Sequence, residues 1–318
     1  MLASASKGDS RALLLTLLVA SSAVAQERSG PAAVELRLEL GERLDYSFTY
    51  DSSVLARLGK TEVEGGVRYE QRLSVLRVTP DPEDAASDSD LVVELGFGRV
   101  RGVSRIPLFG SVEFDSDDAD AEYPSLAAVT ILPVVEPVGK SIRVVLSPSG
   151  RVRSVRGWAR IFEGTNAGKA LANQETAMTD AWFLENAQSL FVLLPERQVD
   201  TGEPWRMPYR RSMFGKGIEF DARCSTAKPA AGTFAYAMGS ASPGPAEASA
   251  QRGWVTDATE ILDASLLGTC EVSTADGFAT RQTIDFVARV NTPGPLGGAM
   301  ESTAEERLSL VRLAPEGE

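Results

Sequence analysis

The chain has 318 residues, of which 43% are hydrophobic and 24% are charged, and these proportions exclude a disordered or a fibrous protein. The formal net charge of −12 has the wrong sign for a protein that wraps a nucleic-acid backbone. The sequence contains no histidine, which excludes serine–histidine and cysteine–histidine catalysis and the common zinc sites.

Residues 1–25 have the pattern of an export signal peptide. Lys7 and Arg11 give a positive start, residues 12–20 form a short apolar run, and an A-x-A cleavage site follows at 23–25. The apolar run is shorter than the roughly 20 residues of a membrane-spanning helix, so we favour cleavage over an uncleaved anchor. No later stretch approaches a membrane span. We therefore expect a soluble protein exported to the periplasm or out of the cell.

Residues 26–160 are predicted to form the first of two β-rich halves. Residues 34–40 alternate apolar and polar side chains, as in a strand with one buried and one exposed face. Similar patterns predict strands at 46–50, 67–78, 91–95, 142–146 and 152–155. The turn Ser147-Pro148-Ser149-Gly150 joins the last two into a hairpin, and such short connections indicate an antiparallel sheet.

An acidic cluster in this half is a candidate cation site. Its members are Asp115, Asp117, Asp118, Asp120 and Glu122. Oxygen ligands at alternate positions suit Ca²⁺, a cation available outside the cell. The central glycine and the distal glutamate of the twelve-residue Ca²⁺ loop are missing, so we favour a solvated acidic loop and expect no cofactor.

Residues 161–195 are predicted to form a helical segment between the two halves. Over 166–194 the apolar residues change to helical spacing, Thr179 or Asp180 can cap the start, and Pro195 ends the segment. One stripe of this helix consists of Leu184, Ala187, Leu190, Phe191 and Leu194. Its polar face lacks the Lys and Arg residues of membrane-binding helices, so we expect it to cover a sheet.

Residues 196–318 are predicted to form the second β-rich half. Strands are expected at 205–209, 218–224, 233–238 and 308–313, with a hairpin over 269–290 that turns at Ala275-Asp276-Gly277. Composition predicts loops at 239–251 and 291–298.

The second half is a possible degenerate repeat of the first. Gly41-Glu42 and Gly202-Glu203 each precede a predicted strand, and Gly150 and Gly277 each mark a late hairpin turn. The alternative is two unrelated sheets with ordinary turn glycines.

The two cysteines, Cys224 and Cys270, lie in predicted strands of the second half. An even count in an exported chain indicates one disulfide, which would join two neighbouring strands. Two separate buried thiols are the alternative. A catalytic thiol is disfavoured because no histidine is present to activate it.

Several short motifs occur in an order that resembles a known family. They are Gly41-Glu42 before a strand, VEFDS at 112–116, GKS at 139–141 leading to LSPSGRV at 146–152, and then, after a helix, LLP at 193–195 and VDTGEPW at 199–205. This layout resembles a domain-of-unknown-function family of exported bacterial proteins with a signal peptide and a β-rich body, over most of residues 34–313. The resemblance implies an exported β-rich protein, and it implies no activity or catalytic residue.

These observations predict an α+β fold, mostly antiparallel β, with two β-rich halves joined by an amphipathic helical segment. The sequence contains neither G-x-S-x-G nor G-x-x-x-x-G-K-[ST], and we assign no catalytic residue. Trp158, Trp182, Trp205 and Trp254 offer a sugar-stacking platform, although we favour packing roles for them.

The function that these features favour is a non-enzymatic binding or scaffold protein of the bacterial envelope, with an envelope protein or an apolar ligand as partner. One alternative is a carrier of an apolar ligand, which predicts a groove between the helix at 181–194 and the sheet, whereas a scaffold predicts a filled core there. The other alternative is a hydrolase with paired carboxylates, similar to a glycosidase.

Overall fold

The structure is a computed structural model that describes residues 34–58, 61–84, 86–107, 109–118, 121–165, 168–169, 179–200, 202–213, 216–227, 232–240, 260–293 and 299–315. The chain divides into a unit of residues 1–30 and a unit of residues 31–318, and all described residues belong to the second. The predicted signal peptide and most of the predicted loop at 239–251 lie outside the described residues.

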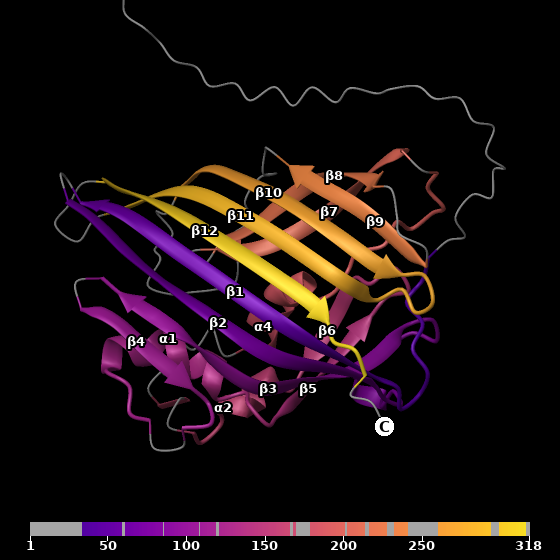
Figure 1. Cartoon of the computed structure of the whole chain (residues 1–318), viewed down its shortest axis with the longest axis horizontal. Helices are drawn as coiled ribbons and strands as arrows, with labels where there is room; N and C mark the ends of the chain where they lie inside the picture. The colour runs from indigo at the N-terminus through magenta and orange to yellow at the C-terminus, as the bar shows by residue number, and fades with distance from the viewer. Residues whose placement is uncertain are drawn as a thin grey trace, which may run out of the picture. The chain divides into compact units, whose positions relative to one another are not determined.

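Twelve strands of the described chain form one antiparallel sheet in the order β6-β5-β3-β2-β1-β12-β11-β10-β9-β8-β7, with β4 beside β3 (Figure 1). The strands are β1 (Arg43–Leu58), β2 (Thr61–Arg77), β3 (Leu91–Ile106), β4 (Gly110–Asp115), β5 (Ser141–Leu146), β6 (Val152–Arg156), β7 (Pro204–Met213), β8 (Lys216–Ala227), β9 (Thr233–Ser240), β10 (Glu260–Ser273), β11 (Ala279–Pro293) and β12 (Ala299–Arg312). The prediction of a mostly antiparallel β protein is thus confirmed.

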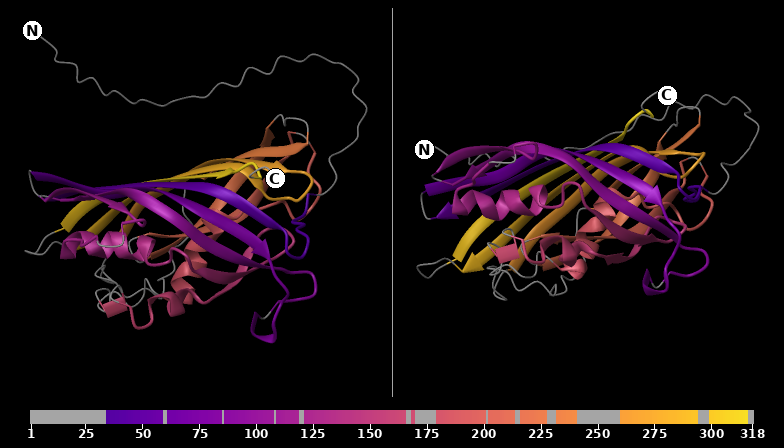
Figure 2. Two further views of the ribbon diagram at one scale, coloured as in Figure 1. Left: turned by 60° about the horizontal axis from the view of Figure 1, so that its bottom comes forward. Right: turned by 90° about the horizontal axis from the view of Figure 1, so that it is seen from below.

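The helices lie on one face of this sheet, as both views of Figure 2 show. They are α1 (Ser125–Val135), α2 (Trp158–Phe162), α4 (Asp180–Ala187) and the 3₁₀ turn η3 (Gln188–Leu190), while a further 3₁₀ turn, η1 (Pro82–Asp84), precedes β3. The main core lies between the helix-covered face and the helices. A smaller core forms where α1 covers β3 and β4, around Val100, Phe114 and Ile131.

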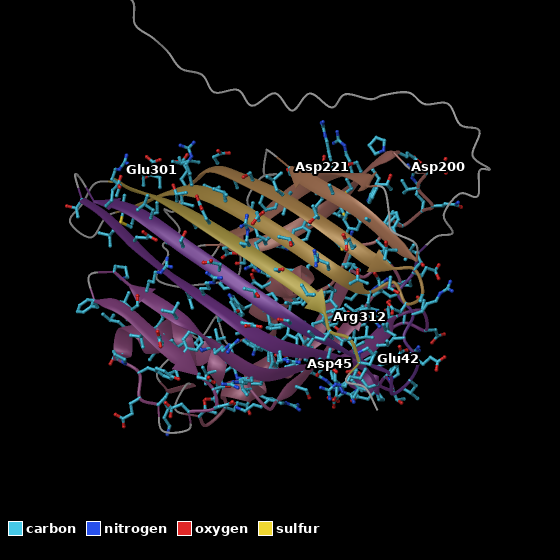
Figure 3. All side chains as sticks on the ribbon, viewed as in Figure 1. Glu42, Asp45, Asp200, Asp221, Glu301 and Arg312 are labelled. Atoms are coloured by element: carbon cyan, nitrogen blue, oxygen red, sulfur yellow. The ribbon has the colours of Figure 1, made fainter. Side chains whose placement is uncertain are left out.

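The strands of the two predicted halves belong to a single sheet, because β1 pairs with β12. Their register runs from Tyr46 opposite Arg312 to Arg57 opposite Glu301, so Glu301 and Arg312 lie at opposite ends of β12 (Figure 3). On the helix-covered face this register places Phe48 opposite Leu310, and both side chains are buried. The prediction of two halves joined by a helix is therefore not confirmed as an architecture.

Helix α4 lies against both ends of the sheet. It contacts β6 and β7, the two terminal strands of the sheet order. Arg211 of β7 also reaches Glu306 of β12, although β7 is separated from β12 in the sheet by β8, β9, β10 and β11. The sheet is therefore curved around the helix-covered face, and α4 occupies the space between its two terminal strands.

Residues 34–40 do not form a strand, and the prediction for this segment is wrong. The N–H group of Leu36 donates to the carbonyl oxygen of Pro148 (3.0 Å), whereas that of Arg37 donates to the carbonyl oxygen of Asp276 (2.7 Å). The segment thus lies between two hairpin turns and joins no ladder. The alternation is confirmed only at Leu36 and Leu38, which are buried between exposed neighbours, because Leu40 is exposed.

The turns that suggested a repeat have the same geometry in both halves. Gly41 and Gly202 have positive φ angles of 83° and 84°. In each turn a glutamate carboxylate accepts from a backbone N–H three residues earlier, Glu42 from Glu39 (2.8 Å) and Glu203 from Asp200 (3.2 Å). The two β-rich segments therefore open with the same local turn, while their descent from a duplication stays a prediction.

The predicted disulfide between Cys224 and Cys270 is not formed, and both thiols are free and buried. Cys224 lies on β8 opposite Met238 of β9, and Cys270 lies on β10 opposite Tyr236 of β9. Because β9 separates the two strands and the paired positions on β9 differ by two residues, the two Cα atoms are more than about 10 Å apart at a strand spacing of about 4.8 Å. A disulfide needs Cα atoms closer than about 7 Å, so the expectation of neighbouring strands was wrong.

Candidate functional site

A cavity of about 260 Å³ lies between the helices and the helix-covered face of the sheet. The sheet wall comes from β1, β2, β3, β7 and β12, and the opposite wall comes from the end of α1, from α2, and from α4 with η3. Most lining side chains are apolar, among them Phe48, Leu73, Phe97 and Leu308 on the sheet. This is the place where the sequence analysis expected either a groove or a filled core.

Helix α4 is shorter than predicted, and hydrogen bonds position both of its ends. It begins at the predicted cap, where the Thr179 hydroxyl accepts from the N–H of Trp182 (3.1 Å). The Asp180 carboxylate accepts from the N–H groups of Gly157 (3.2 Å) and Ala159 (2.9 Å), at the start of α2. These bonds match a negative charge to the positive end of α2 and fix α4 beside it.

Past η3 the chain runs on as a buried, non-helical segment. The Gln188 side chain accepts from the N–H of Val152 on the edge strand β6 (3.0 Å) and donates to the carbonyl oxygen of Gly150 (3.1 Å). The predicted stripe residues Phe191 and Leu194 are buried in this extended segment and not on a helix. The helix therefore ends at its C-cap Gln188, whose side chain hydrogen-bonds to the edge strand β6.

Aromatic side chains form much of the helix-side wall of the cavity. The rings of Trp158 and Trp182 stack with centroids 6.0 Å apart, and Trp158 lies 4.5 Å from Phe183 and 5.8 Å from Phe97. Trp158 is buried, as is Trp205, so these two tryptophans have the packing role that we favoured. Trp254 lies outside the described residues.

The polar part of the cavity is built around a buried ion pair. The Arg211 guanidinium donates to Glu306 Oε2 through Nε (3.0 Å) and Nη2 (2.7 Å). The Tyr50 hydroxyl donates to Glu306 Oε1 (2.9 Å), and Arg211 Nη1 lies 3.4 Å from the hydroxyl of Ser189. The side chains of Arg211 and Glu306 are only 8% and 13% exposed, so the pair is largely shielded from solvent.

Burial and this ion pair shift the nearby ionisation equilibria. Burial is the largest single effect on Arg211 and by itself would lower its pKa, but the charge and hydrogen bond of Glu306 together with the effects of Tyr50 and Tyr209 outweigh it, and the pKa is raised. Burial raises the pKa of Tyr50, and the charge of Glu306 adds to this effect. Burial also raises the pKa of Tyr69, so the cavity contains a charged pair and neutral phenols at physiological pH.

Gln71 of β2 brings an unsatisfied polar group to the cavity. It is 6% exposed, and its Nε2 has no hydrogen-bond partner within the described chain. In the pairing of β2 with β3, Gln71 is opposite Val100 and Leu73 is opposite Phe97, so β3 carries one extra residue between these pairs. This bulge lets all four side chains point to the buried face, and bulges commonly redirect side chains at functional sites.

The acidic cluster lies apart from this cavity. Asp115 and Asp117 both pair with Arg99, at 2.6 Å to Nη2 and 2.9 Å to Nε, and Glu122 is exposed. Asp120 lies outside the described residues, while Asp118 is described. Across the described ranges, no group of three or more acidic or cysteine side chains is placed to hold a metal ion.

The sequence analysis did not identify the polar residues of the cavity, although the sequence carries a signal for two of them. Inward positions of β12 are otherwise small or apolar, and Glu306 occupies one of them. Arg211 likewise continues the buried series of Trp205, Met207 and Tyr209 on β7. A charged residue in the apolar phase of a strand is unusual unless it is paired inside the protein.

Among the helices described, none has both the length and the apolar character needed to span a membrane. No family model matches the sequence, and no curated protein matches it.

Three solved structures illustrate the similarity that was found. A lipovitellin structure concerning lipid–protein interactions has TM-score 0.48 and 10% identity. The match covers 89% of this chain but 26% of the lipovitellin chain, so this chain spans about a quarter of the length of lipovitellin. DynF from the dynemicin biosynthesis pathway of Micromonospora chersina has TM-score 0.21 and 11% identity, with 95% of both chains covered. A DUF1329 family protein from Desulfovibrio piger has TM-score 0.15 and 10% identity, covering 86% of this chain and 87% of that one. All three TM-scores are below 0.5, and we base no argument on them.

Proposed function

We propose that this protein binds a small ligand with an apolar chain in the cavity between α4 and the sheet. The observation that carries this proposal is the cavity itself, which is partly open to solvent and lined mostly by apolar side chains. A concave apolar surface of this kind is the usual form of a small-molecule site. At about 30 Å³ for each water molecule, the volume of about 260 Å³ has room for about nine groups of water or methylene size.

The chemistry of the lining supports a binding role. Small-molecule sites are typically apolar and aromatic with a few polar groups that orient the ligand. Phe48, Phe97 and Trp158 supply the apolar surface, and Gln71 supplies a buried donor without a partner in the described chain. A ligand would recover both the contacts and the hydrogen bond that the cavity lacks.

A paired-carboxylate hydrolase has less support at this site. A glycosidase uses two carboxyl groups that flank the scissile bond. The described lining of the cavity contains one carboxylate, Glu306, and its two oxygens already accept bonds from Arg211 and Tyr50. We therefore propose a binding protein and not an enzyme.

We further propose that binding takes place in the bacterial envelope, in the periplasm or outside the cell. The support for this location is the signal-peptide pattern of residues 1–25. The proposed partner is an apolar ligand of that compartment, and the three-part division into residues 26–160, 161–195 and 196–318 remains a proposal about domain organisation.

The test compares two alanines on the same helix. Ala187 of α4 lines the cavity and is 1% exposed, whereas Ala181 of α4 is exposed. Ala187→Met should fill part of the cavity and weaken binding of the small apolar ligand 1-hexene, measured by isothermal titration calorimetry, by at least about 10-fold. Ala181→Met makes the same change outside the cavity and should bind as the wild type does. Equal binding by both variants, or no binding by the wild type, would refute the proposed function.

A further inference from the structure

We propose that the ligand is an uncharged medium-chain acyl ester, with its carbonyl oxygen bound by Gln71, and not a fatty-acid anion. This inference rests on the proposed function and specifies the ligand of the same cavity. Three features of the described lining carry it: the charge balance, the one unpartnered donor and the volume.

The charge balance disfavours an anionic ligand. Arg211 and Glu306 are the charged residues of the described lining, and they neutralise each other at 2.7 Å. Arg211 directs Nε and Nη2 to Glu306 and Nη1 to Ser189, so each of its three nitrogens already makes a hydrogen bond. A ligand carboxylate would have to displace Glu306 or remain uncompensated, and a buried charge without a partner is strongly unfavourable.

The unpartnered group in the lining is a donor, so it calls for an acceptor. Within the described chain, Gln71 Nε2 is the buried side-chain atom of this lining that makes no hydrogen bond. An ester carbonyl accepts a hydrogen bond and brings no donor of its own that would need a partner. It therefore satisfies Gln71 without creating a new unsatisfied group, which a buried amine or hydroxyl would do.

The volume limits the chain length. The cavity has room for about nine methylene-sized groups, and the carbonyl takes part of that room. The aromatic wall around Trp158, Trp182 and Phe183 is continuous with the sheet-side residue Phe97, so an extended chain contacts rings along its length. The methyl ester of a six-carbon acyl chain has nine non-hydrogen atoms and fills this space.

The experiment uses isothermal titration calorimetry at pH 7.5 to measure how tightly three ligands of equal chain length bind the purified protein. The ligands are methyl hexanoate, sodium hexanoate and 1-hexene. We expect methyl hexanoate to bind at least about 100-fold more tightly than hexanoate, because the anion loses several kcal/mol of solvation. Hexanoate binding as tightly as the ester would overturn the inference and leave the proposed function standing.

A Gln71→Leu variant isolates the hydrogen bond. It should weaken binding of methyl hexanoate by about 10-fold and leave 1-hexene, which has no acceptor, bound at least as tightly as before. Equal affinity of wild type and variant for the ester would overturn the role of Gln71. If none of the three ligands binds to the wild type, the proposed function itself fails. The comparison of ester and anion in the wild type decides the charge argument even where the variant does not fold.

Discussion

The buried pair Arg211–Glu306 allows a quantitative test of how the curved sheet is held. The Glu306→Gln substitution keeps the shape of the side chain but leaves the Arg211 guanidinium, which is 8% exposed in its side chain, without a countercharge. Breaking a buried pair by removing one partner typically costs about 3–5 kcal/mol. We expect a loss of free energy of unfolding in this range, because Arg211 also loses a charge-assisted acceptor for two N–H groups.

The neighbouring residue on the same strand provides a matched control. Arg307 faces the opposite side of β12 and pairs with Asp285, with side-chain exposures of 69% and 34%. An exposed pair of this kind contributes at most about 1 kcal/mol, so Arg307→Gln should cost far less than Glu306→Gln. Urea denaturation followed by circular dichroism and tryptophan fluorescence measures both values.

The double variant Arg211→Met with Glu306→Leu separates a stranded charge from lost packing. Removing both charges eliminates the uncompensated guanidinium, so this variant should be more stable than Glu306→Gln alone. The reasoning is refuted if Glu306→Gln costs no more than Arg307→Gln, because the pair would then be accessible to water. It is refuted equally if the double variant is the least stable of the three.

Two further predictions concern groups whose pKa is raised by burial. The pKa of both cysteine thiols is raised to about 12, so iodoacetamide at pH 8 should alkylate native Cys224 and Cys270 at less than about 1% of the rate of an exposed thiol. Both thiols should react once the protein is unfolded without reductant. One intact disulfide in the denatured mass would contradict the structure. Burial likewise raises the pKa of all six tyrosines, so the unfolded chain loses phenol protons first, and stability should fall as pH rises above the unfolded value of about 10. Five of them are deeply buried, namely Tyr46, Tyr50, Tyr69, Tyr209 and Tyr236, whereas Tyr123 is more accessible. Absorbance at 295 nm should therefore report most of the tyrosinate together with loss of circular dichroism, and ionisation of more than one tyrosine in the folded protein near pH 10 would contradict this.

The strands were predictable because their signal is local. Alternation at 46–50, for example, locates β1, and the turn at Gly277 locates the β10–β11 hairpin. Residues 34–40 carry the same alternation but form no strand, because a ladder also requires a neighbouring strand in register. The N–H groups of Leu36 and Arg37 donate to turns more than 120 residues apart in the sequence, at Pro148 and Asp276, and alternation contains no information about such partners.

The predicted architecture is wrong where the pairing strands are distant in the sequence. Pairing of β1 with β12 joins the ends of the chain into one sheet, and no short-range pattern specifies it. The prediction of a disulfide is wrong because strand order is also set by distant partners: β9 lies between the strands that carry Cys224 and Cys270. The helix at 166–194 was predicted from spacing alone, whereas the extended course after Leu190 is set by bonds such as that of the Tyr236 hydroxyl to the carbonyl oxygen of Leu193 (2.8 Å).

The two walls of the cavity differ in how they are held in place. The sheet wall consists of strands paired along ladders of ten or more residues, so many backbone hydrogen bonds fix it. The opposite wall includes α4, a helix of eight residues, and isolated helices of that length are not stable in water. Its position therefore depends on tertiary contacts: Phe183 and Ala187 are buried in the core, and Asp180 and Gln188 bond to α2 and to the edge strand β6. The sheet wall is thus held by backbone ladders, whereas the α4 wall is held by its side chains.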